Sequence, residues 1–223
     1  MTDSLLIAID GPSGSGKSST SRGVAQRLGL AYLDTGSLYR AAAIAFLGSG
    51  LEPGQDDEIA ALVTGSSITP GTDPANPSTM LDGRDVTAEI RDPRVSEKVS
   101  VVATIPAVRE WLNEQFRAII DAHGRRIVVE GRDITTVVAP DADVRVLLVA
   151  DPAARIARRQ AELGGAVNAE QVTDQVVRRD RDDATVSQFE QPAEGVELID
   201  STHLDLSQVI DAICQMVPAG KQA

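Results

Sequence analysis

The stretch IAIDGPSGSGKSST, residues 7–20, runs from apolar residues into a glycine-rich turn that ends on a lysine and two serines. Gly11, Gly16, Lys17 and Ser18 fit the pattern G-x-x-x-x-G-K-[ST], and the sequence KSSTSRGVAQRLG then continues as a helical pattern. A strand, a phosphate-binding turn and a helix in this order predict a nucleoside triphosphate site near the start of an α/β domain.

The residue types in this turn suit a phosphate ligand. Glycines let the backbone direct its N–H groups onto a di- or triphosphate, and the helix N-terminus adds partial positive charge. We expect Lys17 to reach the outer phosphates and Ser18 to ligate Mg²⁺. Ser13 and Ser19 are expected as supporting donors. The predicted phosphate site comprises Gly11, Pro12, Ser13, Gly14, Ser15, Gly16, Lys17, Ser18 and Ser19.

Short apolar runs recur between helical patterns along the rest of the chain. They are LLIAID (5–10), LAYLD (30–34), RIVVEG (126–131), RVLLVA (145–150) and VELID (196–200). This rhythm is typical of a parallel sheet covered by helices. The chain has 223 residues, 42% of them hydrophobic, which is enough for one core with a small appended lobe. We therefore predict a single α/β domain over residues 1–223.

The rhythm breaks between the second and third apolar runs. Residues 69–90, TPGTDPANPSTMLDGRDVTAEI, are rich in proline, glycine and aspartate. Within them, the pair Asp82-Gly83 lies between short β-prone stretches and predicts a hairpin. Helical spacing follows, and Pro106 is expected to open a second helix there. We interpret this region as an inserted lobe.

Charge and cysteine content narrow the partners and the compartment. The 21 basic and 33 acidic residues give a formal net charge of -12, which argues against a broad basic face for nucleic acid. All but three of the basic residues are arginines, a usage that suits bidentate phosphate contacts but that codon bias explains equally well. The lone Cys214 excludes an internal disulfide, and we see no signal peptide or membrane-spanning run. We expect a cytoplasmic protein.

Phosphoryl transfer between two phosphate groups needs cations on both, so arginines elsewhere in the chain are of interest. Arg40 follows a predicted turn at Asp34–Gly36, and Arg132 lies beyond the end of a predicted strand, where open α/β sheets bind ligands. Two arginine-rich runs, ARIARRQ and RRDRDDATV, come later. Solvated, self-paired helix faces are the ordinary explanation for such runs. Because the same chain has a predicted phosphate-binding turn, we favour a catalytic role for these arginines.

Several motifs together resemble bacterial cytidylate kinase, a nucleoside monophosphate kinase of the P-loop type. They are IDGPSGSGKSS, LDTGSLYR, DGRDVTAEIR, PAVREWL, VVEGRDITTVV and RRDRDDAT, and the resemblance covers nearly the whole chain. It implies a P-loop kinase core with a five-stranded parallel sheet. It also implies a small nucleotide-binding lobe at about residues 65–105 and a mobile, helical, arginine-bearing lid at about residues 152–175.

The resemblance also implies an acceptor site for CMP. Arg40 and Arg132 match positions on the CMP phosphate, with Thr35 nearby. Positions that read cytosine are matched by Ser100, Arg109 and Asp133, and positions at the sugar by Arg179 and Asp183. Cytosine chemistry agrees with a carboxylate in this set, because its amino group donates where uracil has a carbonyl.

The implied reaction is transfer of the γ-phosphoryl group of ATP to CMP or dCMP, with Mg²⁺ as cofactor. Lys17 and the lid arginines Arg155, Arg158 and Arg159 would act as the catalytic cations. No strong general base is needed, because a phosphate dianion is already nucleophilic. We expect small nucleotides as the only partners, with no nucleic acid polymer or membrane, and a monomeric enzyme.

The sequence departs from the family pattern at two positions. Thr135 stands where glycine is expected, which is tolerable if the backbone there keeps a negative φ. Val186 stands where the family usually carries another phosphate-binding arginine. Either Arg181 supplies the missing charge, or the acceptor site works with fewer arginines.

Three other functions remain open on the sequence alone. Another small-molecule kinase with a P-loop would share the donor site and differ in its acceptor. A nucleotide-binding regulatory module that has lost catalysis would be consistent with Val186. A GTPase switch is disfavoured because no Asn-Lys-x-Asp motif is present.

Overall fold

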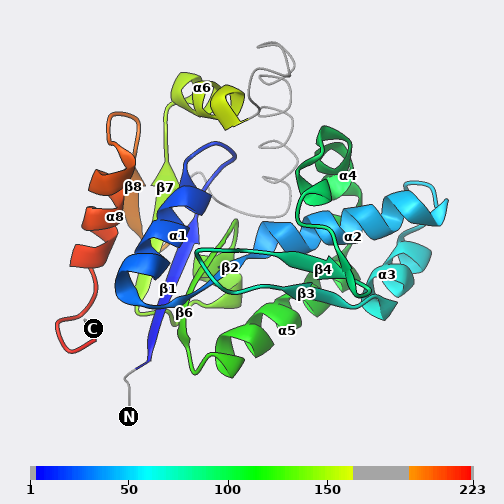
Figure 1. The fold of residues 1–223 in the computed structure, drawn as a ribbon, viewed down its shortest axis with the longest axis horizontal. Helices are drawn as coiled ribbons and strands as arrows, with labels where there is room; N and C mark the ends of the chain where they lie inside the picture. The colour runs from blue at the N-terminus through cyan, green and yellow to red at the C-terminus, as the bar shows by residue number, and fades with distance from the viewer. Residues whose placement is uncertain (1–3, 163–190, 222–223) are drawn as a thin grey trace.

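Five parallel strands form the centre of the structure, a computed structural model that describes residues 4–162 and 191–221 (Figure 1). They are β1 (Leu5–Asp10), β2 (Ala31–Asp34), β6 (Arg126–Gly131), β7 (Val144–Val149) and β8 (Glu197–Asp200). Their order across the sheet is β2-β6-β1-β7-β8, and every neighbouring pair is parallel. The predicted α/β fold class is therefore confirmed, with each predicted strand within one residue of its observed bounds.

Strand β1 lies in the middle of this sheet and is buried along its whole length. Because successive strand residues point to opposite faces, Leu6 and Ala8 join one hydrophobic core. Ile7 and Ile9 join the other. A strand that is covered on both faces reads as a continuous apolar run, as LLIAID does.

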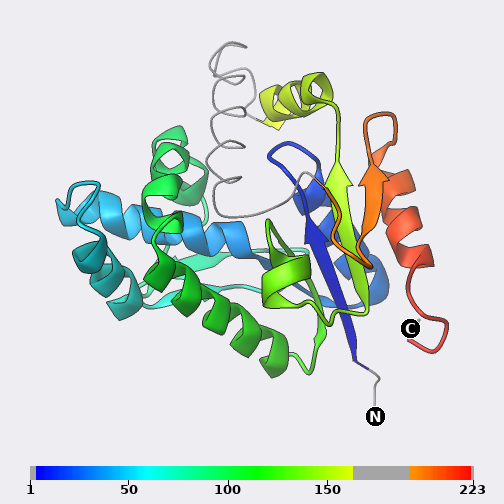
Figure 2. The same ribbon diagram turned by 180° about the vertical axis from the view of Figure 1, so that it is seen from behind.

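Helices cover both faces of the sheet (Figure 2). One face carries α1 (Lys17–Leu28) and α8 (Leu206–Gln215), and the other carries α2 (Thr35–Ser49), α4 (Pro93–Ala103) and α5 (Pro106–Ala122). Pro106 opens α5 at its first position, as predicted. In the two described ranges, no helix has the length and apolar character to cross a membrane.

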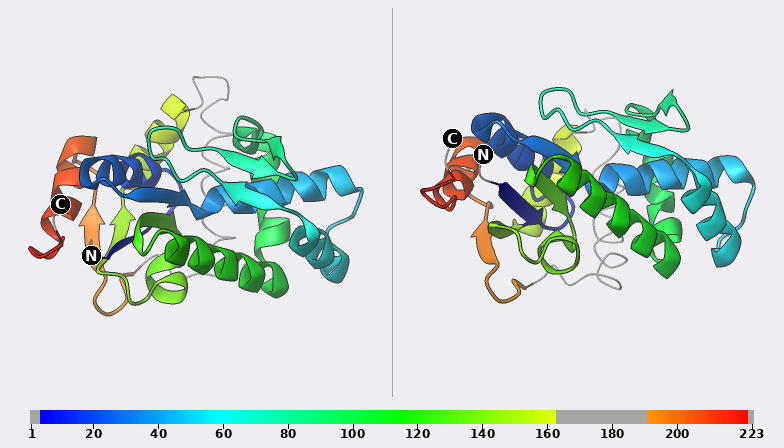
Figure 3. Two further views of the ribbon diagram at one scale, coloured as in Figure 1. Left: turned by 60° about the horizontal axis from the view of Figure 1, so that its bottom comes forward. Right: turned by 90° about the horizontal axis from the view of Figure 1, so that it is seen from below.

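A second, smaller sheet lies within the predicted insertion. It is antiparallel and consists of β3 (Ile68–Pro70), β4 (Thr79–Leu81) and β5 (Arg84–Asp85). Asp82 and Gly83 have φ values of 51° and 77°, the left-handed pair that a two-residue hairpin requires, which confirms the predicted turn. The sheet packs on α2 (Figure 3). We call residues 66–103 the small lobe.

Three further short elements are α3 (Asp56–Gly65), η1 (Glu89–Arg91) and a single π-helical turn, η2 (Ile134–Val138). The predicted lid begins with α6 (Pro152–Glu162), and its remaining residues lie outside the described ranges. The bounds of about 65–105 for the insertion and 152–175 for the lid remain predictions.

One local expectation was wrong. The structure has no turn at Asp34–Gly36, because α2 begins at Thr35, directly after β2. The Asp34 carboxylate accepts a hydrogen bond from the backbone N of Ser37 over 3.0 Å, so it caps the helix without a linking residue. Glu130 lies inside β6, as the predicted run 126–131 implies, because the ladder with β1 continues to Gly131.

The carboxylate of Asp10, at the end of β1, holds η2 in place. It accepts hydrogen bonds from the backbone N of Ile134 (2.9 Å) and from both N and Oγ1 of Thr135 (2.8 and 2.6 Å). Burial raises the pKa of Asp10, and these hydrogen bonds partly offset that rise. Thr135 has a negative φ, so the departure from glycine costs no backbone strain and adds a donor to a buried carboxylate.

We expect Thr135→Val to lower the free energy of unfolding by about 1–3 kcal/mol, because it removes a hydroxyl donor from a buried carboxylate while keeping the side-chain shape. Urea unfolding measures this change. Thr136→Val is the matched control, since Thr136 is the exposed neighbour. Equal stabilities of the two variants would show that the Thr135 hydroxyl does not support Asp10.

Candidate active site

A cavity of about 410 Å³ lies at the carboxyl ends of β1, β2 and β6, between the P-loop (residues 11–18) and the small lobe. Open α/β sheets bind ligands at this edge. The cavity brings together residues that the sequence analysis assigned to both substrates. The predicted residues that line it are Ser13, Gly14, Gly16, Lys17, Ser18, Ser19, Thr35, Arg40, Arg109, Arg132 and Asp133.

The P-loop has the backbone of an anion cradle. Gly16 has a φ of 89°, in the left-handed region that favours glycine, and α1 starts at the next residue. At Gly11 a Cβ would come within 2.2 Å of the Leu148 carbonyl oxygen, so only glycine fits the close approach to β7. The first turn of α1 has no side-chain cap and no acidic residue. Its N–H groups and partial positive charge therefore suit a phosphate.

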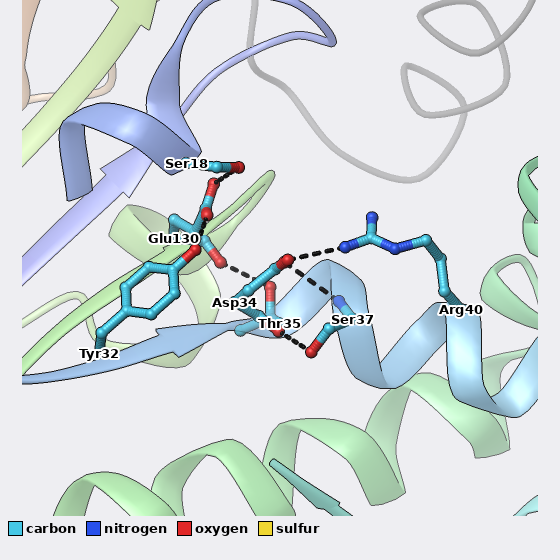
Figure 4. A network of polar contacts seen from close by, with 7 residues as sticks. All are labelled: Ser18, Tyr32, Asp34, Thr35, Ser37, Arg40 and Glu130. Atoms are coloured by element: carbon cyan, nitrogen blue, oxygen red, sulfur yellow. Dashed lines mark hydrogen bonds and ion pairs between the residues drawn. The ribbon is translucent and has the colours of Figure 1, made fainter. Parts of the chain in front are cut away.

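A buried carboxylate joins the P-loop helix to two strands (Figure 4). Glu130 on β6, 1% exposed, accepts a hydrogen bond from Ser18 Oγ over 3.0 Å through Oε2. Its Oε1 accepts one from the Tyr32 hydroxyl of β2 over 2.5 Å. Burial and the nearby Asp34 charge raise the pKa of Glu130, whereas Lys17 and the two hydroxyl donors lower it.

The Ser18 hydroxyl and the Glu130 carboxylate together fit the predicted Mg²⁺. Mg²⁺ prefers hard oxygen ligands and is held in nucleotide sites by one or two protein oxygens together with substrate phosphates. Ser18 Oγ and the Glu130 carboxylate lie side by side at the cavity wall, next to the phosphate cradle. The residues present therefore suit a magnesium-bound nucleotide.

Asp34 positions Arg40, which the sequence analysis assigned to the CMP phosphate (Figure 4). Arg40 Nη2 donates to Asp34 Oδ2 over 2.7 Å, and both side chains are about four-fifths buried, with 16% and 21% exposed. Thr35 Oγ1 donates to the backbone carbonyl of Glu130 over 2.7 Å and so bonds the start of α2 to β6. Arg40 is thus held in the cavity by the carboxylate that also caps its helix.

Two further predicted residues pair with each other across the cavity. Arg109 on α5 donates through Nη2 to Asp133 Oδ2, and both side chains are largely buried. Arg109 also donates to the backbone carbonyl of Ala103 over 3.2 Å, which fixes its guanidinium. Arg132 lies nearer the P-loop, where Nη1 donates to the carbonyl of Gly11 over 2.7 Å.

The α6 arginines contact the P-loop from outside the cavity. Arg155 Nη1 donates to the carbonyl of Ser13 over 3.1 Å, and Arg158 Nη1 donates to that of Ser15 over 3.2 Å. Arg158 also holds Ser201, through its hydroxyl (2.9 Å) and its carbonyl (2.6 Å). Both arginines therefore touch the backbone of the phosphate cradle but do not line the cavity.

Of the other predicted residues, some do not line the cavity and some lie outside the described residues. Gly11, Pro12 and Ser15 form the P-loop backbone without lining the cavity, and Ser100 of α4 does not line it. The side chain of Arg159 and the whole of Arg179, Asp183, Arg181 and Val186 lie outside the described residues.

Sequence reasoning gave no role to Tyr32, Asp34 or Glu130, although each lines the cavity. The available signal was a charged residue at the carboxyl end of an apolar run, as in LAYLD and RIVVEG. Tyr32 and Ser18, which donate to Glu130, are 98 and 112 residues away from it in the chain, so no local sequence pattern pairs them. Arg22 of α1 and Arg91 of η1 also line the cavity and were not predicted.

Among solved structures, an uncharacterized protein from Eubacterium ventriosum ATCC 27560 aligns with this chain with a TM-score of 0.52 at 12% identity. The alignment covers 96% of this chain and 99% of that one. At this level of identity the likeness supports the fold alone.

Sequence comparisons identify the family. A family model described as cytidylate kinase matches residues 7–219. A cytidylate kinase of Cutibacterium acnes is 61% identical over 218 residues, or 97% of each chain. A cytidylate kinase of Rhodococcus opacus is 45% identical over 221 residues, covering 97% of this chain and 96% of that protein. These matches show that this chain, whose cavity combines a phosphate cradle with several arginines, belongs to the cytidylate kinase family.

Proposed function

We propose that the cavity binds ATP on its P-loop side and CMP or dCMP on its small-lobe side, and that it transfers the γ-phosphoryl group between them. A phosphate oxygen of CMP attacks the γ-phosphorus in line, the bond to the β-phosphate oxygen breaks, and ADP and CDP leave. The observation that carries the proposal is one cavity with Lys17 and Ser18 on one side and Arg40 and the Arg109–Asp133 pair on the other.

Catalysis in this site rests on positioning and charge neutralisation. Arg40 is held by Asp34 before any substrate arrives, so its guanidinium needs little reorganisation to meet a phosphate. Arg132 lines the same cavity and donates to the Gly11 carbonyl of the P-loop, which supports its assignment to the CMP phosphate. Like-charged phosphates brought together at about 4 Å repel by about 4 kcal/mol per charge pair at an effective dielectric of 20.

Ser18 and Glu130 are the residues that would hold Mg²⁺. When bound, Mg²⁺ supplies positive charge to the phosphates of ATP. Tyr32 donates to Glu130 from the side opposite Ser18, so the carboxylate is fixed at both oxygens. We keep Arg155 and Arg158 of the lid as proposed catalytic residues, and their hydrogen bonds to the carbonyls of Ser13 and Ser15 support this assignment. A monomeric, cytoplasmic enzyme also remains part of the proposal.

Arg109 and Asp133 would read the base. Together they offer donors and an acceptor side by side, which complements the ring acceptors and amino group of cytosine. Uracil presents a carbonyl where cytosine has its amino group, so the carboxylate would face another acceptor. An assay of ADP release with CMP, dCMP, UMP, AMP and shikimate tests the assignment. CMP or dCMP should be the preferred acceptor, and preference for another would contradict it.

Replacing Lys17 with alanine should lower kcat by at least about 100- to 1000-fold, because its charge acts on the transferring phosphates. Coupled assay of ADP release gives kcat, and thermal unfolding checks that the fold is retained. Lys98→Ala on α4 is the matched control and should keep near-normal turnover. A Lys17→Ala enzyme with near-normal kcat would overturn the donor-site assignment.

Replacing Asp133 with alanine should cost CMP about 5- to 150-fold more in kcat/KM than it costs UMP, because the cytosine amino group loses its acceptor. The substitution also frees Arg109 from its ion pair, which affects CMP and UMP alike. The ratio of the two kcat/KM losses therefore isolates the contribution of Asp133 to reading the base. Asp141→Ala, which removes an exposed partner of Arg125, serves as the control. If CMP and UMP lose equally, Asp133 does not read the base.

A further inference from the structure

The loop between β3 and β4, residues 71–78, connects the small lobe to the core. At one point, the carbonyl of Thr72 accepts a hydrogen bond from the backbone N of Tyr32 over 2.9 Å. Tyr32 lies on β2, which is an edge strand of the core sheet. The loop therefore bonds to an edge that would otherwise be open on that side.

At a second point the loop is bonded to α1. Arg22 Nε donates to the carbonyl of Pro74 over 3.0 Å, and Gln26 Nε2 donates to the same oxygen over 3.2 Å. The Arg22 contact is partly buried, whereas the Gln26 contact is exposed. Figures 1 and 3 show the loop extending from the small sheet to lie beside α1.

The loop presents this carbonyl from a shape fixed by its own bonds. Asp73 Oδ1 accepts from the backbone N of Ala75 over 2.8 Å, and the carbonyl of Asp73 accepts from Asn76 N over 3.2 Å. At the loop base, Gly71 N donates to the carbonyl of Ser78 over 2.8 Å. Such Asx turns restrict the backbone locally, so a bond at Pro74 restrains the whole loop.

The restrained loop is also a wall of the cavity. Its ends, at Gly71, Pro77 and Ser78, line the cavity together with Ser18 and Ser19 of the P-loop side. Arg22 follows Ser18 by four residues, so the two side chains lie on the same face of α1. One helix thus carries both a phosphate-binding residue and the donor that holds the wall of the acceptor lobe.

We propose that Arg22 is a positioning residue for CMP: it holds the β3–β4 loop against α1 and so fixes the small-lobe wall of the cavity before the acceptor binds. A wall held in place beforehand does not have to be ordered on binding, which lowers the cost of association. The proposal rests on the function proposed above, with the acceptor on the small-lobe side. Arg22 also lines the cavity, but its proposed action is through the bond to Pro74 and not through contact with the nucleotide.

Steady-state kinetics of Arg22→Ala, Arg22→Lys and Arg27→Ala test this role. Arg22→Ala should raise KM for CMP about five- to tenfold, the effect of losing one hydrogen bond, with KM for ATP and kcat changed by less than about twofold. Arg22→Lys should recover most of the loss, because an ammonium group can still donate to the Pro74 carbonyl. Arg27 is the matched control on the same helix, in an exposed ion pair with Asp211.

Hydrogen exchange of the ligand-free enzyme supplies a readout other than activity. Arg22→Ala should speed exchange at the amide of Tyr32, whose acceptor is in the loop, while Arg27→Ala should leave it unchanged. Equal kinetics and exchange of the two alanine variants would overturn the proposal. A parallel rise in KM for ATP would overturn it as well.

A double-mutant cycle separates positioning from direct contact with substrate. Asp73→Ala loosens the turn that presents Pro74, so Arg22→Ala added to it should raise KM for CMP little further. Multiplied effects would show that Arg22 acts on the nucleotide itself and would overturn the proposal. A wild-type enzyme without CMP-dependent ADP release would instead contradict the proposed function.

Discussion

The carboxylate of Glu130 is the interaction on which the rest of the site depends. It lies near the carboxyl end of β6, the strand next to β1, and accepts hydrogen bonds from Ser18 of a helix and from Tyr32 of another strand. A buried carboxylate without such donors would be strongly disfavoured. The need to satisfy it ties α1, β2 and β6 to one geometry, and that geometry sets the P-loop opposite the start of α2.

Paired charges solve a related problem for the arginines of the cavity. Arginines gathered in one cavity would repel one another, and each would be costly to bury alone. Asp34 and Asp133 each partner one arginine, so the cations are placed before the substrate arrives. If the proposed function holds, an incoming phosphate would meet an Arg40 guanidinium that Asp34 has already oriented, so little reorganisation would be needed.

Local features of this protein could be predicted from its sequence, and distant pairings could not. The P-loop and the Asp82-Gly83 hairpin depend on a few consecutive residues whose backbone needs are specific. The contact between Arg22 and Pro74 joins positions 52 residues apart, and neither residue type alone indicates the other. Family resemblance assigned Arg109 and Asp133 to positions that read cytosine. Only the structure shows that their side chains form an ion pair.

The direct passage from β2 into α2 has a mechanical consequence. With Asp34 ending the strand and Thr35 starting the helix, no linking residue is free to act as a hinge. Helix α2 has 15 residues and is therefore about 22 Å long. It extends from that fixed junction as one continuous helix, and the small sheet packs against it. Bending at the start of α2 would break the Asp34 cap and the Thr35–Glu130 bond together, so a movement of the small sheet relative to the core sheet would have to come from the connections beyond Ser49.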